Sequence, residues 1–365
     1  MDMYLKNIRT IKDIKKYEKI VLFGAGQTSK ETIRFLKDNN LICLFDSDSS
    51  KWGNKIDGYY VYSPSDISDI VDDNTAIVIS CISNQYEISI ELINKYNIKK
   101  DHIFSYTNKY CEDFVYDTKK IINNFNRIKK VIDLLEDNES KEYLKNSIIC
   151  RLTRNPLYIK QNSNIKVPYE YSNIVLPKKG DVIIDCGAYI GDTAELFLKK
   201  LNEECKIYCI EPFEDSYDQL CSNVRLNNIS NKVECLYNAV SNEKRTDYIR
   251  CNEDAEYVCA NLKDNQGRLG NKINVDKIDN LFKNINQIDF IKMDIEGEEV
   301  NALNGASNVI RNMKPNMMIS AYHLVEHIWE IPETIKNIDS SYKIYAGHQP
   351  KAPFEIEFYL KSNQK

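Results

Sequence analysis

Two acidic residues and one histidine in the last third of the chain have the types and spacing needed to remove a proton from a hydroxyl. Asp294 follows the apolar run Ile288–Met293, and Glu296 lies two residues further on. His323 follows the next apolar run, Asn316–Ser320. The carboxyl ends of parallel strands meet at one edge of a sheet, so we expect these side chains to lie together. We predict His323, or Asp294 directly, as the general base, with Glu296 as a further catalytic candidate.

A second group of residues predicts a nucleotide cradle. An apolar β-branched run ends at Asp185 and gives way to Gly187, Gly191 and a helical pattern. Glycines at such a turn let a ligand approach backbone N–H groups and the helix N-terminus, although they can also serve close packing alone. The next run, Lys206–Ile210, ends in Glu211, whose carboxylate can accept both hydroxyl protons of a ribose. The candidate cofactor-binding residues are Asp185, Gly187, Ala188, Tyr189, Gly191, Thr193, Glu211, Asn238 and Asp294.

Alternating strands and helices surround both groups and must position them. In the second half of the chain, five apolar runs predict a parallel sheet with crossover helices. Two further runs, Tyr342–Ala346 and Glu355–Leu360, have no helix between them and predict an antiparallel terminal hairpin. We therefore expect an α/β fold of two Rossmann-like domains, the C-terminal one with a seven-stranded, mostly parallel sheet. The expected boundaries are 1–108 for a small first domain, 109–165 for a helical linker and 166–365 for the second domain.

The first domain has its own glycine-rich turn. Gly24 and Gly26 follow the apolar run Lys19–Phe23, and the next run, Leu41–Phe45, ends in Asp46. This offset is typical of a dinucleotide site with the acidic residue on a ribose, so an NAD-dependent oxidoreductase is an alternative function. A serine replaces the third glycine, however, and the unit ends after about half of a dinucleotide fold. Gly24, Gly26 and Asp46 are candidate nucleotide-binding residues, and a docking domain with an empty cradle is an equal alternative.

Composition excludes several classes of protein. The 49 Lys and Arg against 54 Asp and Glu give a formal net charge of -5, without the basic field that a nucleic-acid binder needs. No apolar run is long enough to span a bilayer, and the first ten residues contain no signal-peptide core. The 11 cysteines form no Cys-x-x-Cys pair and lie mostly in apolar runs, as reduced core residues do. We expect a cytoplasmic protein with no nucleic-acid partner, no transmembrane segment and possible homo-oligomerisation.

Several motifs of the second half resemble the FkbM family of methyltransferases. They are Asp185–Thr193, Glu211-Pro212, Phe290–Glu299, Lys314-Pro315, Tyr322-His323 and Trp329–Pro332. The resemblance implies S-adenosyl-L-methionine as the cofactor, with the turn holding its methionine half and Glu211 its ribose. It also implies methyl transfer to a hydroxyl, commonly on a sugar or a secondary metabolite. The chain departs from the family pattern at Leu324–His327 and at Gly347-His348, both on the expected acceptor side.

The first domain resembles small Rossmann-like domains of bacterial glycan-biosynthesis proteins. The resemblance rests on Asp46–Asp48, Lys51–Gly53, Gly58-Tyr59 and Ser63-Pro64, and implies at most a nucleotide or nucleotide-sugar ligand. Together with the FkbM motifs, it makes a sugar or glycan precursor, in the biosynthesis of surface glycans or glycoprotein glycans, the expected acceptor.

Several alternatives stay open. An amine could replace the hydroxyl, because a neutral amine needs little more than alignment and a carboxylate such as Asp294 nearby. His323, His327 and His348 could join Asp294 and Glu296 around a divalent ion, although His323 and His327 could equally be successive turns of a helix, and we expect no metal. A glycan-binding or scaffold protein would have kept the fold and lost the chemistry. That alternative is opposed by five intact residues, Asp185, Gly187, Gly191, Glu211 and Asp294. The polar segment Glu243–Lys272 could be a substrate loop or lid.

Overall fold

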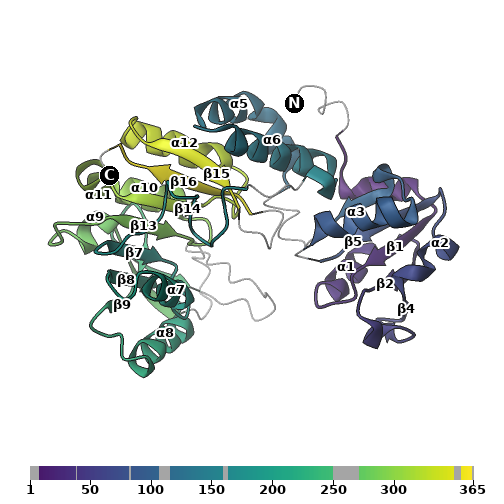
Figure 1. Ribbon diagram of the computed structural model, residues 1–365, viewed down its shortest axis with the longest axis horizontal. Helices are drawn as coiled ribbons and strands as arrows, with labels where there is room; N and C mark the ends of the chain where they lie inside the picture. Colours follow the sequence, from purple (N-terminus) through teal and green to yellow (C-terminus); the bar gives the residue numbers. More distant parts are fainter. Residues whose placement is uncertain are drawn as a thin grey trace. The chain divides into compact units, whose positions relative to one another are not determined.

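The computed structural model describes residues 8–37, 39–81, 84–106, 116–158, 163–249, 271–348 and 355–363. The chain divides into two compact units (Figure 1). Unit 1 comprises residues 1–126, 139–162 and 348–355, and unit 2 comprises residues 127–138, 163–347 and 356–365. The two units therefore interleave along the sequence, and a cut near residue 108 would divide unit 1.

Unit 1 contains a six-stranded sheet of order β3-β4-β2-β1-β5-β6. Its strands are β1 (Lys19–Phe23), β2 (Leu41–Phe45), β3 (Lys55–Ile56), β4 (Tyr59–Tyr62), β5 (Thr75–Ile79) and β6 (Ile103–Ser105). All neighbours are parallel except β3 and β4. Because the chain moves outward from β1 to β2 and β4 and then returns to the other side at β5, the strand order reverses beside β1. This sheet is more complete than the half fold expected from the sequence.

The residues of β1 explain why helices cover both faces of this sheet. Ile20 and Leu22 belong to one buried apolar cluster, whereas Val21 and Phe23 belong to another. A strand that is buried on both faces reads as a continuous apolar run, as here. The helices of this part are α1 (Ser29–Leu36), α2 (Ile67–Ile70) and α3 (Gln85–Tyr96).

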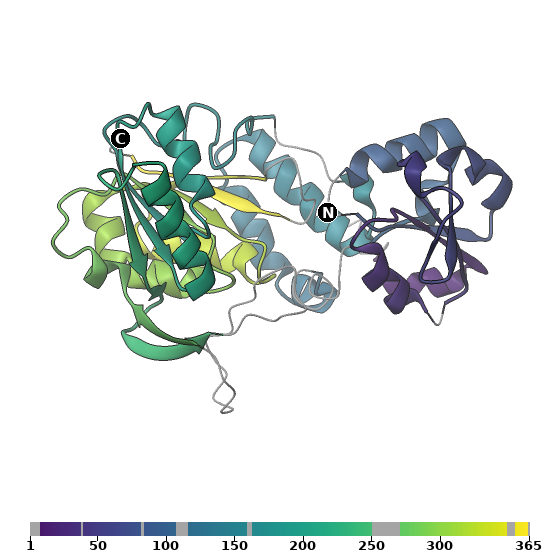
Figure 2. The same cartoon turned by 90° about the horizontal axis from the view of Figure 1, so that it is seen from below.

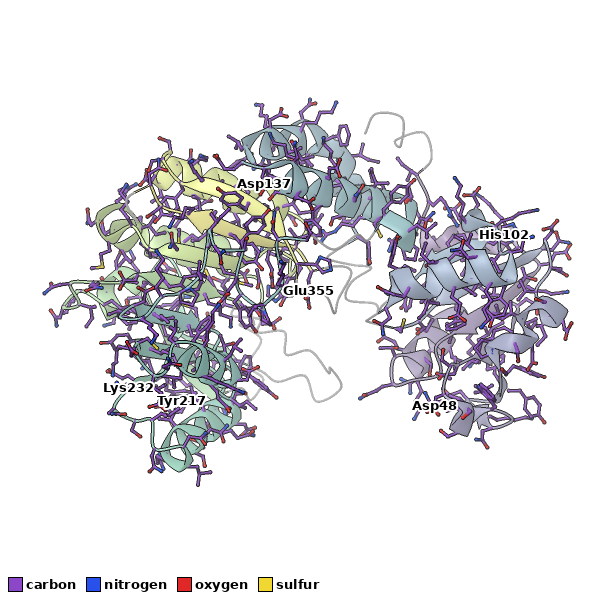
Figure 3. All side chains as sticks on the ribbon, viewed as in Figure 1. Asp48, His102, Asp137, Tyr217, Lys232 and Glu355 are labelled. Carbon is purple, nitrogen blue, oxygen red and sulfur yellow. The ribbon has the colours of Figure 1, made fainter. Side chains whose placement is uncertain are left out.

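Three helices occupy the region expected to be a helical linker. They are α4 (Thr118–Asn123), α5 (Phe125–Leu134) and α6 (Asn138–Thr153). The break between α5 and α6 is fixed to unit 2, because the Tyr171 hydroxyl donates a hydrogen bond of 2.6 Å to Asp137, which is labelled in Figure 3. None of the helices in the described ranges is both long and apolar enough to cross a membrane.

Unit 2 is built on a seven-stranded sheet of order β15-β16-β14-β13-β7-β8-β9. The strands are β7 (Val182–Cys186), β8 (Lys206–Glu211), β9 (Val233–Tyr237), β13 (Phe290–Met293), β14 (Asn316–Ser320), β15 (Lys343–Gly347) and β16 (Glu357–Lys361). Within this sheet, β16 alone runs opposite to the other six strands. The predicted fold, a mostly parallel sheet of seven strands with an antiparallel terminal hairpin, is confirmed.

Helices cover both faces of the unit 2 sheet. They are α7 (Asp192–Lys200), α8 (Glu214–Leu226), α9 (Ile278–Leu281), α10 (Glu299–Gly305), α11 (Ser307–Met313) and α12 (His327–Ile338). Figures 1 and 2 show α7 and α8 on one face and α9 to α12 on the other. With this arrangement the loops after β7, β8, β13 and β14 open at a single edge of the sheet.

The segment expected to be a loop or lid is flanked by strands. A small sheet of order β10-β12-β11 contains β10 (Ala239–Val240), β11 (Arg245–Ile249) and β12 (Asn271–Asp276). Strands β11 and β12 pair antiparallel. The ends of the predicted segment are thus regular, and the central part, 250–270, lies outside the described residues, so the lid stays a prediction.

Candidate functional site

The turn after β7 is pressed against the turn after β13. Gly187 has φ +77°, and a Cβ atom placed on it would lie 1.8 Å from the backbone oxygen of Asp294. The N–H group of Asp294 in turn donates to Cys186 O at 3.1 Å. At Gly191, with φ +92°, a Cβ atom would lie 2.8 Å from a Leu220 methyl group. Both glycines therefore serve close packing, and Gly187 joins the predicted cradle to the predicted catalytic turn.

Asp185 and Lys292 form a buried ion pair under this junction. The two residues are register partners on neighbouring strands β7 and β13. Lys292 Nζ lies 3.1 Å from Asp185 Oδ1 and donates a hydrogen bond of 2.7 Å to Gly187 O. Burial by itself would lower the pKa of Lys292, but the charge of Asp185 outweighs burial and raises the pKa above the ordinary value of a lysine. The lysine therefore stays cationic. Asp185 therefore supports the cradle indirectly, by pairing with the lysine that donates a hydrogen bond to Gly187 O.

Glu211 ends β8 with its carboxylate facing the same turn. Its Oε2 accepts the N–H of Tyr189 at 2.8 Å, and its Oε1 accepts the N–H of Phe213 at 2.9 Å. Burial raises the pKa of Glu211 to about 7, against the effect of both N–H groups. A carboxylate has about four acceptor positions, so two remain for the hydroxyls of a ribose. The residue therefore fits the role predicted for it.

The remaining predicted cofactor residues have different surroundings. Ala188 lies in the apolar core of unit 2, and its N–H donates to Ile210 O at 3.1 Å. Tyr189 is 55% exposed, with φ 47°. Thr193 is buried in the first turn of α7, and Asn238 donates to the backbone of the next residue at 2.8 Å. Tyr189 is the most exposed member of this set, and the roles of all four stay predictions.

Asp294 and Glu296 lie on a tight turn between β13 and α10. Glu296 has φ 58° and Gly297 has φ 106°, so two consecutive residues are left-handed. Such strain in a residue other than glycine persists only where its surroundings hold it, and is frequent at functional sites. Asp294 accepts a hydrogen bond of 2.9 Å from the Tyr322 hydroxyl. Burial raises the pKa of Glu296 to about 7, although His323 opposes this.

His323 lies among three carboxylates, the predicted Asp294 and Glu296 and the unpredicted Glu299. Its Nε2 atom is 3.4 Å from Asp294 Oδ1 and 3.5 Å from Glu296 Oε2. Its Nδ1 atom is 2.9 Å from Oε1 of Glu299, the first residue of α10. Burial alone would lower the pKa of His323, but the charges of Glu299, Glu296 and Asp294 raise it to about 10. The three residues predicted to be catalytic are therefore brought together.

The same cluster bears on the metal alternative. Asp294, Glu299 and His323 offer ligand atoms within 4.8 Å of one another. However, Glu299 Oε1 already accepts the Ile295 N–H at 3.0 Å as well as the His323 ring. Glu299 Oε2 lies 3.2 Å from His327 Nδ1. The two hydrogen bonds to Glu299 Oε1 favour a paired histidine and carboxylate cluster over a metal site. The third histidine of the metal hypothesis, His348, belongs to unit 1, where its ring stacks on Tyr143.

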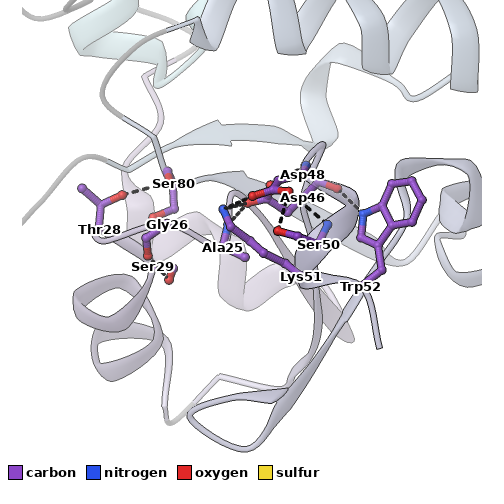
Figure 4. A network of polar contacts seen from close by, with 10 residues as sticks. All are labelled: Ala25, Gly26, Thr28, Ser29, Asp46, Asp48, Ser50, Lys51, Trp52 and Ser80. Carbon is purple, nitrogen blue, oxygen red and sulfur yellow. Dashed lines mark hydrogen bonds and ion pairs between the residues drawn. The ribbon is translucent and has the colours of Figure 1, made fainter. Parts of the chain in front are cut away.

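The glycine-rich turn of unit 1 is shown in Figure 4. Asp46 Oδ2 accepts the Ala25 N–H at 2.7 Å and Lys51 Nζ at 3.0 Å, and Asp46 Oδ1 accepts the Asp48 N–H at 2.8 Å. The Trp52 indole donates to Asp46 O at 2.7 Å. The carboxylate expected to bind a ribose is therefore engaged by its own turn, which weighs against the NAD hypothesis.

The two glycines of this turn differ. A Cβ on Gly24 would lie 2.6 Å from Ser80 O, whereas one on Gly26 would have no atom within 4 Å. Only Gly26 faces open space, so it is the better probe of a ligand in this cradle.

Sequence reasoning missed three side chains of the unit 2 site. Lys292 and Glu299 lie inside the run that carries the family resemblance, and Tyr322 precedes the predicted base. A lysine within an apolar strand was the available signal for Lys292, because a buried charge requires a partner. For Glu299 and Tyr322 no local signal existed, since their partners lie 24 and 28 residues away.

Comparison with known proteins identifies the domains. Residues 185–352 match the family model of the methyltransferase FkbM domain, and residues 16–104 match the model described as C2185-like, N-terminal. The chain therefore carries an FkbM methyltransferase domain. Among curated proteins, none matches significantly.

Solved structures share the fold. The crystal structure of methyltransferase FkbM from Methylobacillus flagellatus KT covers 98% of this chain and 98% of its own, at 18% identity and a TM-score of 0.71. UDP-D-quinovosamine 4-dehydrogenase from Vibrio fischeri covers 27% of this chain and 84% of its own, at 17% identity and a TM-score of 0.23. Fibrillarin from Aeropyrum pernix, solved with bound S-adenosyl-L-methionine, covers 51% and 68%, at 13% identity and a TM-score of 0.32. Only the first similarity is strong enough to support the fold.

Proposed function

We propose that unit 2 transfers a methyl group from S-adenosyl-L-methionine to a hydroxyl of a sugar or glycan precursor. One observation carries the proposal: the glycine of the cradle packs on the backbone of Asp294, which belongs to the histidine and carboxylate cluster. A donor site and a proton-accepting group thus meet at one edge of the sheet. The match to the methyltransferase FkbM domain supports the same reaction.

The residues that would hold the donor fit its chemistry. Glu211 has acceptor positions for two ribose hydroxyls, and the backbone N–H of the exposed Tyr189 donates to the same carboxylate. Asp294 adds a carboxylate, 28% exposed at its side chain, close to the expected positive charge. When bound, the donor supplies a methyl group on a sulfonium that an aligned nucleophile can displace.

The cluster can take the proton that the acceptor loses. As the acceptor oxygen forms its bond to the methyl carbon and the carbon to sulfur bond breaks, the hydroxyl proton must pass to a base. His323 Nε2 and Asp294 Oδ1 face each other at 3.4 Å, so a proton accepted by one can be shared with the other. Tyr322 holds Asp294 through its hydroxyl and limits the directions in which the carboxylate can turn.

An amine of a glycan substituent is the second candidate acceptor. Three carboxylates, Asp294, Glu296 and Glu299, surround a single site with two histidines, and an amine would find partners among them. The hydroxyl stays the first candidate, because a hydroxyl must lose its proton to a base during the transfer and the Asp294 carboxylate and His323 Nε2 lie together at this turn, 3.4 Å apart.

For unit 1 we propose a nucleotide or nucleotide-sugar ligand at the turn of Gly24 and Gly26, which Asp46 holds in place by accepting the Ala25 N–H. Open space at Gly26, and the position of this turn beside the strand-order reversal, support it. Such a ligand would suit a protein acting on glycan precursors.

Calorimetric titration of the full-length protein tests the proposal. S-adenosylhomocysteine should bind the wild type, and Gly187→Val should abolish that binding. NADH should give no heat. Binding of NADH without S-adenosylhomocysteine would refute the methyltransferase proposal and move the functional centre to unit 1.

A further inference from the structure

We propose that Glu299 is the positioning residue of this site, holding His323 with Nδ1 turned into the protein and Nε2 turned toward Asp294 and Glu296. The inference rests on the proposed function, because it concerns the histidine that would serve methyl transfer. It assigns to Glu299 the orientation of that ring and the nitrogen at which it exchanges protons.

The contacts of Glu299 allow only this orientation. Its side chain is fully buried, and its Oε1 lies 2.9 Å from His323 Nδ1 and 3.0 Å from the Ile295 N–H. Burial raises the pKa of Glu299, but His323 and His327 lower it to about 2, so the carboxylate is ionised. An ionised carboxylate only accepts hydrogen bonds. His323 Nδ1 must therefore carry a hydrogen, and proton exchange is left to Nε2.

The turn before α10 explains how one glutamate can do this. Left-handed residues Glu296 and Gly297 reverse the chain, so that Glu299 returns beneath the Ile295 N–H. The same reversal leaves Asp294 and Glu296 on the Nε2 side of the ring. One short turn thus supplies the carboxylate that holds Nδ1 and the two carboxylates that face Nε2.

Every element packed around the ring contributes a titratable group. Asp294 and Glu296 come from the turn after β13, Glu299 comes from α10 and His327 comes from α12. Tyr322 precedes His323 in the sequence, and the centroids of their two rings lie 4.3 Å apart. Among the three carboxylates, Glu299 makes the shortest contact with a ring nitrogen, at 2.9 Å against 3.4 and 3.5 Å for Asp294 and Glu296. A carboxylate on a histidine Nδ1 fixes the tautomer and raises the basicity of the other nitrogen.

Histidine NMR of the unliganded full-length protein tests this without any turnover. The chain has four histidines, so selective ¹⁵N labelling can resolve them, with His323→Gln identifying the signal of interest. His102, labelled in Figure 3, lies in unit 1 and serves as an internal reference. In the wild type, His323 should stay protonated through neutral pH and lose its proton from Nε2, leaving the Nδ1–H tautomer. A wild-type Nε2–H tautomer would overturn the proposal even if no variant folds.

Glu299→Gln should then move the His323 midpoint down toward ~6.5, the ordinary histidine value. The matched control is Glu298→Gln, because the neighbouring Glu298 accepts from Ser241 and Asn301 instead and should leave the His323 signal unchanged. An unchanged midpoint in Glu299→Gln, with circular dichroism showing a folded protein, would overturn the proposal.

Kinetics with an accepted substrate complete the test. Glu299→Gln should lower kcat by about 10² or more with little change in KM, and Glu299→Asp should restore part of the loss. Unchanged kcat in Glu299→Gln would count against the positioning role. Failure of the proposed function looks different: the wild type would not bind S-adenosylhomocysteine, whatever the histidine spectra show.

Discussion

At the scale of single residues, the charge around His323 decides what the site can do. The imidazole is nearly inaccessible and has carboxylates on both nitrogens. Carboxylates at this range favour the protonated ring, so a proton is held near Nε2 in the unliganded protein. A positively charged ligand at the same edge would oppose that proton and help to release it. The site is therefore suited to a cationic donor and a neutral acceptor.

His323→Gln should abolish most turnover and leave the donor site intact. Loss of the base should lower kcat by about 10²- to 10⁴-fold, because a positioned acid or base contributes that much. Calorimetry should find the affinity for S-adenosylhomocysteine within about threefold of the wild type, a factor worth less than 1 kcal/mol. Substantial remaining turnover would assign proton removal to Asp294 instead.

Unit 2 should lose stability as the pH rises above neutrality. The folded-state pKa of His323 is raised to about 10, so its contribution is complete below the unfolded value of ~6.5 and is lost as the pH rises through the folded value. Urea unfolding followed by Trp329 emission measures this, because Trp329 is buried on α12 and Trp52→Phe removes the other tryptophan. In the Trp52→Phe background, His323→Gln should make the free energy of unfolding fall less steeply with rising pH. Equal slopes with and without His323 would show that another group causes the pH dependence.

At the scale of elements, the contact between two turns depends on one missing side chain. Gly187→Ala should weaken binding of S-adenosylhomocysteine by at least about 100-fold, since the new Cβ would overlap the Asp294 carbonyl and force the turns apart. The same variant should lower the free energy of unfolding by more than about 3 kcal/mol.

Gly180 offers a matched control for that variant. Its φ of +88° is as demanding as that of Gly187, but a Cβ on it would meet no atom within 4 Å. Gly180→Ala should therefore cost only the ~1–2 kcal/mol of a left-handed alanine and leave binding unchanged. Equal losses in the two variants would mean that backbone conformation matters and the contact with Asp294 does not.

Strands β7 and β13 are joined by a buried ion pair. Removing one partner should cost more stability than removing both. Lys292→Met leaves Asp185 buried and unpaired, which should lower the free energy of unfolding by about 3–5 kcal/mol. The double variant Asp185→Asn/Lys292→Met should recover part of this loss, since no isolated charge remains. Denaturant unfolding of the four proteins completes the cycle, and additive losses would show that the pair does not interact.

At the scale of the whole molecule, the two units should bind their ligands separately. Gly26→Glu adds bulk and negative charge in the open part of the unit 1 turn. The wild type should bind a nucleoside diphosphate, and Gly26→Glu should abolish that binding while changing the affinity for S-adenosylhomocysteine by less than about twofold. Calorimetry of both proteins with both ligands measures this. Loss of S-adenosylhomocysteine binding in Gly26→Glu would show that the units are coupled.

The sequence by itself determined the fold class and the edge at which the site lies. Apolar runs, helical spacing and glycines are local patterns, and they led to the seven-stranded sheet, the terminal hairpin and the position of Asp294 and His323 after neighbouring strands. The FkbM motifs were equally local, and the domain match confirmed them. Local order was enough here because the ends of parallel strands meet at one edge whatever the side chains are.

Only the tertiary structure decided which of these side chains touch. The partners of Lys292 and His323 depend on strand register and on the reversed turn after Met293, and neither leaves a local pattern. Asp46 illustrates the limit most clearly: its spacing suits a ribose, but its oxygens accept hydrogen bonds from Ala25, Asp48 and Lys51. A sequence places a carboxylate at the end of a strand, whereas the folding of the next few residues decides whether that carboxylate is still available to a ligand.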